Sequence, residues 1–249
     1  MIELDFRLIE HKKNGEEVVV SGNAAIARGL IEGSVRVMTS YPGAPCAEIM
    51  ENLAFLSEDY DLYLEWSVNE KVAFEVAAAA AMSGKRSVFV TKHVGMNVAA
   101  DPLMHICYAG IDAGMVIISA DDPGAFNSNI EEDSRIFARL AGIPGIEPAD
   151  QQEAKDMILQ GLEISERTKL PVFMRVTNRI LYGRGKVIIG EMQNIERDEG
   201  FRKEGLRRYI AGRNAVKQHQ WLYQQQEQLR SIVEVVPFNN VEWAMQKKY

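Results

Sequence analysis

Residues 69–97 read NEKVAFEVAAAAAMSGKRSVFVTKHVGMN, and they combine the pattern of a helix with that of a following strand. It places a carboxylate, Glu70, at the head of an apolar, alanine-rich helix that runs to Ser83-Gly84. The β-branched run 87–91 then predicts a strand, followed by a glycine-containing turn that ends at Asn97. Taken alone, an acid in the first turn of a helix is explained by its attraction to the positive end of the helix dipole, which stabilises the helix by about 0.3–1 kcal/mol.

Short β-branched runs alternate with helix-length segments from Val18 to about Ile189. This pattern is typical of βα units around a mostly parallel sheet. We therefore predict a doubly wound α/β domain over residues 18–190. Strands are expected at 18–20, 35–39, 62–66, 87–91, 115–119 and 172–176, with a short extended piece near Ile146. Helices are expected at 23–32, 47–56, 70–82, 98–109, 130–141 and 151–167.

Two segments flank this domain. Residues 1–17 form an N-terminal extension of mixed charge. Residues 191–249 carry ten Lys or Arg against eight Asp or Glu, although the whole chain has a net charge of −7. The central part of this second segment is rich in Gln, Arg and Lys with spaced apolar residues, and it predicts a solvated helical arm or linker.

Composition narrows the class of protein. At 249 residues with 47% hydrophobic content, the chain can bury one large core. The negative net charge argues against a nucleic-acid partner, because that affinity comes mainly from Lys and Arg. No apolar run reaches membrane-spanning length and residues 1–17 lack a signal-peptide core, so we expect a cytoplasmic protein. The two cysteines, Cys46 and Cys107, offer neither a zinc nor an iron–sulfur ligand set, and we expect no metal site in this chain.

A second group of candidate residues follows the strand expected at 35–39. The run Tyr41-Pro42-Gly43-Ala44-Pro45-Cys46-Ala47-Glu48 leads from that strand into a helix. Open α/β sheets bind ligands at the carboxyl ends of their strands, so this loop is a candidate site. An ordinary strand-to-helix turn, with proline at the start of a helix, explains it equally well.

Several of these runs resemble one enzyme family. The helix and strand at 69–97 resemble the pyrimidine-binding half of thiamin diphosphate enzymes. The loop 41–48 resembles the Tyr-Pro-x-Thr-Pro-Ser-Ser-Glu turn of the 2-oxoacid:ferredoxin oxidoreductases, with Ala44 in place of the Thr. Closest is the indolepyruvate:ferredoxin oxidoreductase large subunit, which the chain resembles over about residues 20–190. The matching runs are 91–102, 117–123, 131–135, 142–144, 147–148 and 152–154.

The resemblance implies roles for individual residues. Glu70 is the catalytic carboxyl group, because a carboxyl group bound to the pyrimidine ring nitrogen favours the imino tautomer that takes a proton from the thiazolium carbon. Its rival, Glu75, points to a different helix face. The resemblance implies that the cofactor is bound by Pro42, Gly43, Glu70 and Asn97, and the substrate by Ala44, Lys92 and His93. Two alternatives stay open: Asn97 caps the following helix, and His93 is a satisfied loop histidine.

The resemblance also implies missing parts. The family holds the cofactor diphosphate and Mg²⁺ through a Gly-Asp-Gly segment, which this chain lacks. We therefore expect a partner domain or subunit that holds both, an iron–sulfur or ferredoxin protein, coenzyme A, and a homo- or hetero-oligomer. The implied reaction is oxidative decarboxylation of an aryl or other bulky 2-oxoacid to acyl-CoA, with electrons passing to ferredoxin. The alternatives are half of a non-oxidative thiamin-dependent decarboxylase or lyase, and a catalytically silent assembly subunit.

Overall fold

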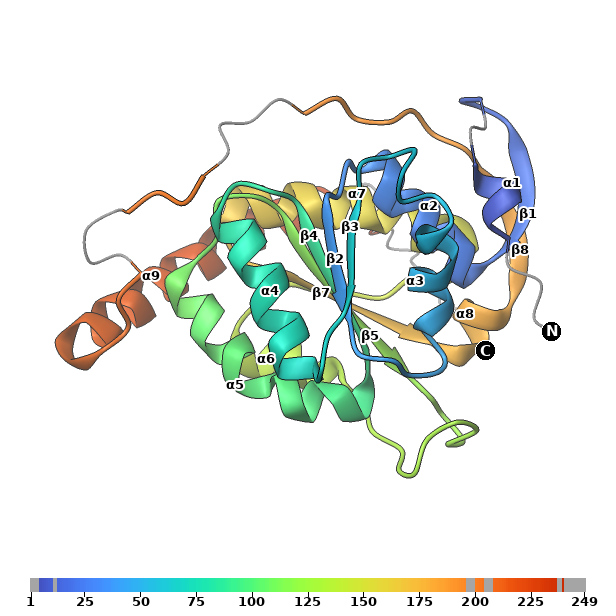
Figure 1. Cartoon of the computed structure of the whole chain (residues 1–249). Coiled ribbons are helices and arrows are strands. Elements are labelled where there is room, and N and C mark those ends of the chain that lie inside the picture. The colour runs from blue at the N-terminus through green and yellow to red at the C-terminus, as the bar shows by residue number, and fades with distance from the viewer. Residues whose placement is uncertain (1–4, 11–12, 196–199, 204–207, 237–238, 240–249) are drawn as a thin grey trace, which may run out of the picture.

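The computed structural model describes residues 5–10, 13–195, 200–203, 208–236 and 239 (Figure 1). Its centre is a sheet of six parallel strands. These strands are β2 (Val37–Ser40), β3 (Tyr63–Trp66), β4 (Ser87–Lys92), β5 (Met115–Asp121), β6 (Gly145–Ile146) and β7 (Val172–Thr177). They lie in the order β3-β2-β4-β5-β7-β6. The predicted α/β class and parallel sheet are confirmed.

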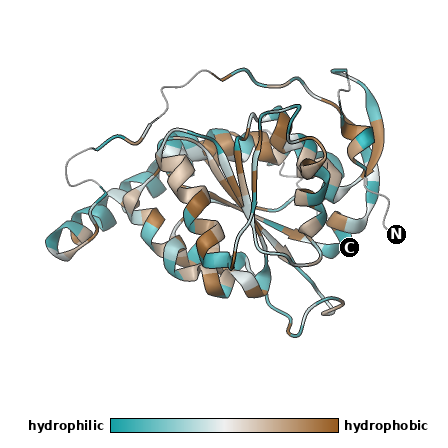
Figure 2. Ribbon diagram, in the orientation of Figure 1, coloured by the Kyte–Doolittle hydropathy of each residue, from teal (hydrophilic) through white to brown (hydrophobic). Residues whose placement is uncertain are grey.

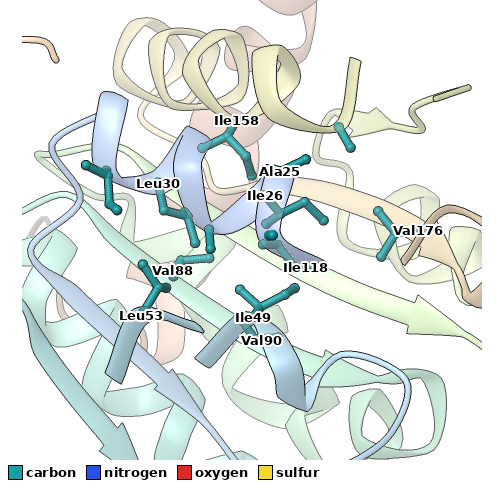
Figure 3. Packing of buried hydrophobic residues seen from close by; sticks show 14 of the residues in the cluster. Ala25, Ile26, Leu30, Ile49, Leu53, Val88, Val90, Ile118, Ile158 and Val176 are labelled. Carbon is teal, nitrogen blue, oxygen red and sulfur yellow. The ribbon is translucent and has the colours of Figure 1, made fainter. Parts of the chain in front are cut away.

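Helices cover both faces of this sheet. One face is covered by α2 (Gly22–Glu32), α3 (Ala47–Ala54) and α7 (Gln151–Thr168), and the other by α4 (Glu70–Met82), α5 (His93–Ala109) and α6 (Arg135–Ala141). Figure 3 shows the first core, in which Ile26 of α2, Ile49 of α3 and Ile158 of α7 meet the sheet. In the second core the rings of Phe74 and Phe89 meet edge to face, with their centroids 5.3 Å apart.

Local sequence explains where the long helices begin. Asn69 caps α4 by accepting a hydrogen bond from the amide of Val72 at 3.0 Å, and Asp150 caps α7 by accepting one from Glu153 at 2.8 Å. Such caps satisfy backbone NH groups that have no partner inside the helix. The alanines of α4 also leave room for a neighbour, and α4 packs along α5 through them.

The chain leaves adjacent strands β2 and β4 toward opposite faces of the sheet, because α3 follows β2 on one face and α5 follows β4 on the other. A parallel sheet opens a crevice at such a point, at the carboxyl ends of its strands. Two hydroxyl groups hold this region together. Thr39 Oγ1 donates to the Ala73 carbonyl at 2.6 Å, and Ser40 Oγ donates to the Val90 carbonyl at 2.8 Å.

Several sequence-based boundaries were wrong. Strand β1 (Glu17–Ser21) does not join the main sheet; it pairs antiparallel with β8 (Arg184–Ile188), which follows the short helix α8 (Asn178–Tyr182), and neither β8 nor α8 was expected. The burial of β1 alternates along the strand, as suits a ribbon with one solvent-facing side. Helix α5 begins at His93 rather than Val98, and α6 begins at Arg135 rather than Ile130.

The described helices of both flanking segments pack on the domain. In the short helix α1 (Phe6–Ile9), Ile9 is fully buried. Helix α9 (Gly212–Val233) contacts α5 and α7, and buries Leu222 and Ile232. Figure 2 shows that much of the remaining α9 surface is hydrophilic. Within the described residues of the expected helical arm, Gly212–Val233 is a helix, whereas residues 200–203 and 208–211 are not helical.

Candidate functional site

Glu70 is the first residue of α4 and lies at the carboxyl edge of the sheet. Its side chain is half-buried, and its Cγ and Oε1 atoms lie against Gly95 in the first turn of α5. Within the described part of the chain, no hydrogen bond or ion pair reaches the Glu70 carboxylate. A half-buried carboxylate without a protein partner is able to bind a donor group of a ligand.

Lys92 connects two loops at the carboxyl edge of the sheet. It is the last residue of β4, and its aliphatic carbons would lie 3.4–3.8 Å from a Cβ placed on Gly43 in the loop after β2. Its Nζ atom donates to the Asn127 carbonyl at 3.3 Å and to Ser128 Oγ at 3.4 Å, in the loop after β5. These are long contacts for an ammonium group, so the charge can turn toward a stronger acceptor.

His93 and Asn97 hold that same loop. His93 is fully buried, and its Nδ1 and Nε2 atoms face the backbone carbonyls of Ala120 at 3.4 Å and Ile130 at 2.9 Å. Asn97 donates through Nδ2 to both carboxylate oxygens of Glu132, at 2.9 and 3.1 Å. Asn97 does not cap a helix, because it lies inside α5. In this structure both side chains fasten the loop 122–134 instead of facing Glu70.

The other side of this loop is fastened by two acids. Asp122 accepts hydrogen bonds from the Asn127 amide at 2.6 Å and from Asn178 Nδ2 at 2.9 Å. Burial alone would raise the pKa of Asp122, but these and further hydrogen bonds hold that pKa below its usual value. Asp121 accepts from Arg175 Nε at 2.8 Å. Both acids therefore shape the loop.

The loop after β2 is a compact turn. Pro42 is exposed and Ala44 is partly exposed. The Gly43 carbonyl accepts hydrogen bonds from the Ala47 amide at 3.0 Å and from Cys46 Sγ at 3.4 Å. Burial raises the pKa of the Cys46 thiol to about 12, so this thiol stays protonated and unreactive. The predicted residues Pro42, Gly43 and Ala44 thus present backbone and small apolar groups next to Lys92.

The rim around Glu70 is apolar and open. Trp66 and Val68, just before α4, are 43% and 81% exposed, and Val98 on α5 is 47% exposed. Glu75, the rival acid, lies elsewhere, in a groove of about 380 Å³ between α4 and α5. Sequence reasoning missed Thr91 and Gly95 as members of the site. Gly95 closely follows the strand expected at 87–91, and this glycine could have indicated a site residue, but it was interpreted as part of a turn.

The described ranges contain no cluster of three or more His, Cys, Asp or Glu side chains that could hold a metal ion. In the same ranges, no helix is both long and apolar enough to cross a membrane.

Comparison with known proteins decides the family. Residues 28–240 match the family described as pyruvate flavodoxin/ferredoxin oxidoreductase, thiamine diphosphate-binding. The chain belongs to this family. It is 41% identical, over 92% of its length, to indolepyruvate oxidoreductase subunit IorA of Pyrococcus horikoshii, and it covers 36% of that relative. It is 43% identical to the IorA subunit of Archaeoglobus fulgidus over 73% of this chain and 30% of that relative. The family inferred from the loop residues is confirmed.

Two more distant proteins are also similar, one in sequence and one in fold. A 2-oxoglutarate synthase subunit KorA from Methanothermobacter thermautotrophicus is 24% identical over 74% of this chain and 51% of that subunit. A solved 2-oxoglutarate:ferredoxin oxidoreductase from Magnetococcus marinus superposes with a TM-score of 0.69 at 16% identity, covering 91% of this chain and 47% of that one. The chain spans about a third of the length of the IorA subunits it matches.

Proposed function

We propose that this chain is the pyrimidine-binding part of a thiamin diphosphate-dependent 2-oxoacid:ferredoxin oxidoreductase. The observation that carries the proposal is the carboxyl group of Glu70. It is half-buried at the carboxyl edge of the sheet, and no described residue binds it. Membership of a thiamine diphosphate-binding family supplies the ligand class.

The residues present fit the pyrimidine end of this cofactor. When bound, thiamin diphosphate supplies a nucleophilic thiazolium carbon and an electron sink for decarboxylation. Glu70 would hold a proton at the pyrimidine ring nitrogen, and Gly95 leaves its carboxyl group unobstructed. Pro42 and Gly43 would lie beside the ring, while Asn97 would act by holding the loop 122–134 in place.

We propose that the ammonium group of Lys92 binds the substrate carboxylate. Its ammonium group has only long contacts to a carbonyl and a hydroxyl oxygen, and a carboxylate would replace them with a charge-assisted hydrogen bond. His93 would act by fastening the loop over this position. Ala44 leaves space where a hydroxyl-bearing side chain would stand, which favours an aryl or other bulky 2-oxoacid. The reaction would be oxidative decarboxylation to acyl-CoA, with electrons passing to ferredoxin.

The proposal includes partners. The sequence has no Gly-Asp-Gly segment and only two cysteines, so a partner domain or subunit would hold the diphosphate with Mg²⁺, and an iron–sulfur protein would carry electrons. The exposed apolar rim of Trp66, Val68 and Val98 is where such a domain would cover the cofactor. A cytoplasmic location belongs to the same proposal.

The test compares the chain alone with the chain assembled with its diphosphate-binding partner. Calorimetry with thiamin diphosphate and Mg²⁺ should give weak binding to the chain alone and tight binding to the assembly. The assembly should also reduce ferredoxin when given indolepyruvate and coenzyme A. Tight Mg²⁺-dependent binding by the single chain would contradict the divided site. Carbon dioxide release without ferredoxin reduction would favour a non-oxidative enzyme, and absence of cofactor binding by the assembly would favour a silent subunit.

A further inference from the structure

Gly95 occupies a position where its own backbone does not require glycine. It lies in the first turn of α5, is buried, and is not among the glycines with positive φ. Glycine in a helix is less favourable than alanine, because it loses more backbone freedom on folding. A compensating reason for glycine must therefore come from its surroundings.

The surroundings supply that reason. A Cβ atom at Gly95 would overlap Thr91 Oγ1 and would lie 2.8 Å from both Cγ and Oε1 of Glu70. Real Cβ atoms essentially never approach other heavy atoms within 3.0 Å. Thr91 is 1% exposed and lies in β4, an interior strand of the sheet, so it cannot move away easily. An added methyl group would therefore push the Glu70 side chain.

Glu70 has no described ion pair that fixes its carboxyl group. No hydrogen bond within the described residues orients it, and the α4 backbone is fixed by Asn69 and Thr39. Packing on the bare Cα of Gly95 is thus what sets the direction of the carboxyl group. Orientation by packing also leaves both carboxyl oxygens unoccupied for a ligand.

We propose that Gly95 is a positioning residue for Glu70, and that its bare Cα is the surface on which the Glu70 side chain is oriented toward the cofactor. This inference rests on the proposed function of Glu70. It adds a residue that acts through Glu70 and does not itself touch substrate. A displacement of a few tenths of an ångström is enough to matter, since catalytic groups act within narrow geometric limits.

The experiment uses the assembled enzyme loaded with thiamin diphosphate and Mg²⁺. The readout is hydrogen–deuterium exchange at the thiazolium carbon, measured by NMR after rapid quenching, because it reports proton removal without substrate turnover.

The variants are Gly95→Ala, Thr91→Ala, Thr91→Ala with Gly95→Ala, Glu70→Gln, and Glu70→Gln with Gly95→Ala. Thr91→Ala removes the overlap with Oγ1, so the Thr91→Ala/Gly95→Ala pair keeps only the clash with Glu70. Gly161→Ala in α7 is the matched control, since its Cβ would lie 3.3 Å from Val116 Cγ2, far from Glu70 in the other core.

We expect Thr91→Ala/Gly95→Ala to fold and to slow exchange by about 10²-fold, close to the loss in Glu70→Gln. Adding Gly95→Ala to Glu70→Gln should then cause no further loss, because both changes act through one carboxyl group. Gly161→Ala should leave exchange unchanged and alter only the melting temperature. Exchange within about 2-fold of wild type in folded Thr91→Ala/Gly95→Ala, or losses that multiply in the double variant, would overturn the inference. Unchanged exchange in Glu70→Gln would instead overturn the proposed function.

Discussion

Glu32 ends helix α2 and Glu70 begins helix α4, and their carboxylates have opposite surroundings. Glu32 is fully buried and accepts from Arg28 Nε at 2.8 Å, from Lys155 Nζ at 2.7 Å and from the Gly190 amide at 2.6 Å. Glu70 is half-buried and accepts from no described residue. Burial of an acid therefore indicates little until its partners are counted: Glu32 is satisfied by the protein, whereas Glu70 is left for a ligand.

The largest effect should follow from breaking the satisfied site. Glu32→Gln would take the carboxylate from Arg28 and leave Lys155 with Asp156 alone, in a place where both basic side chains are less than 5% exposed. Removing one partner of a buried ion pair costs about 3–5 kcal/mol, and we expect a loss of that size in the free energy of unfolding measured with urea. A loss below about 1 kcal/mol would show that water reaches the cluster.

Glu70→Gln should have the opposite profile. The change keeps the shape of the side chain and removes a group that no described residue binds, so stability should change by less than about 0.5 kcal/mol. Turnover of the assembled enzyme should fall at least ~10²-fold, because the proton-carrying group is lost. Glu75→Gln, on the same helix but in the α4/α5 groove, is the control and should keep activity. Near-normal turnover in Glu70→Gln would remove this residue from the mechanism.

A smaller, graded effect is expected for substrate choice. The ratio kcat/KM should be higher for indolepyruvate or phenylpyruvate than for pyruvate, and an apolar pocket discriminates by about 1–3 kcal/mol per methylene group. Lys92→Ala should weaken the use of all three through their shared carboxylate. Lys71→Ala, which removes a surface lysine paired with Asp101 at 2.8 Å, should leave kcat/KM unchanged. Equal or better use of pyruvate would contradict the aryl assignment.

The smallest effect is expected at Cys46. Because burial raises the pKa of its thiol from 9.0 to about 12, the native thiol is protonated at pH 8 and iodoacetamide should not label it. The protonated thiol of Cys46 contributes fully to the free energy of unfolding below pH 9. This contribution is lost as pH rises from 9 toward 12, where only the unfolded thiol ionises. Mass spectrometry after labelling at pH 8 checks the first part, and rapid labelling would place the thiol in an open site.

Periodicity predicted the order of elements between residues 18 and 177, because each strand and helix there has its own apolar pattern. It could not place the start of α5. The first turn, His93 to Asn97, contains Gly95, and the N-cap residue Lys92 makes no side-chain capping bond, so no local signal marks the start of the helix. Strand β1 was found but placed in the wrong sheet, since its partner β8 lies more than 160 residues away.

The candidate site was predicted with the same strengths and limits. Family resemblance singled out Glu70, Lys92, His93 and Asn97, and the structure brings them to one edge of the sheet. The resemblance alone could not distinguish a residue that faces a ligand from one that fastens a loop. For His93 and Asn97 that difference depends on Ile130 and Glu132, which return to them from about 35 residues further along the chain. The cluster around Glu32 gave no local signal, because Lys155 lies 123 residues away.

Helix α9 has a consequence for the integrity of the chain. Its Leu222 packs with the α5 and α6 core, and its Ile232 packs with Ile164 of α7 and Val172 of β7. The connection before it includes residues 201–203, which are exposed and not helical. A protease that cuts at 201–203 should therefore leave two fragments that stay associated, so a nicked chain would migrate as intact protein on gel filtration and separate only in denaturant. After such a cut, α9 would be held to the domain by non-covalent packing alone, as a separate subunit is.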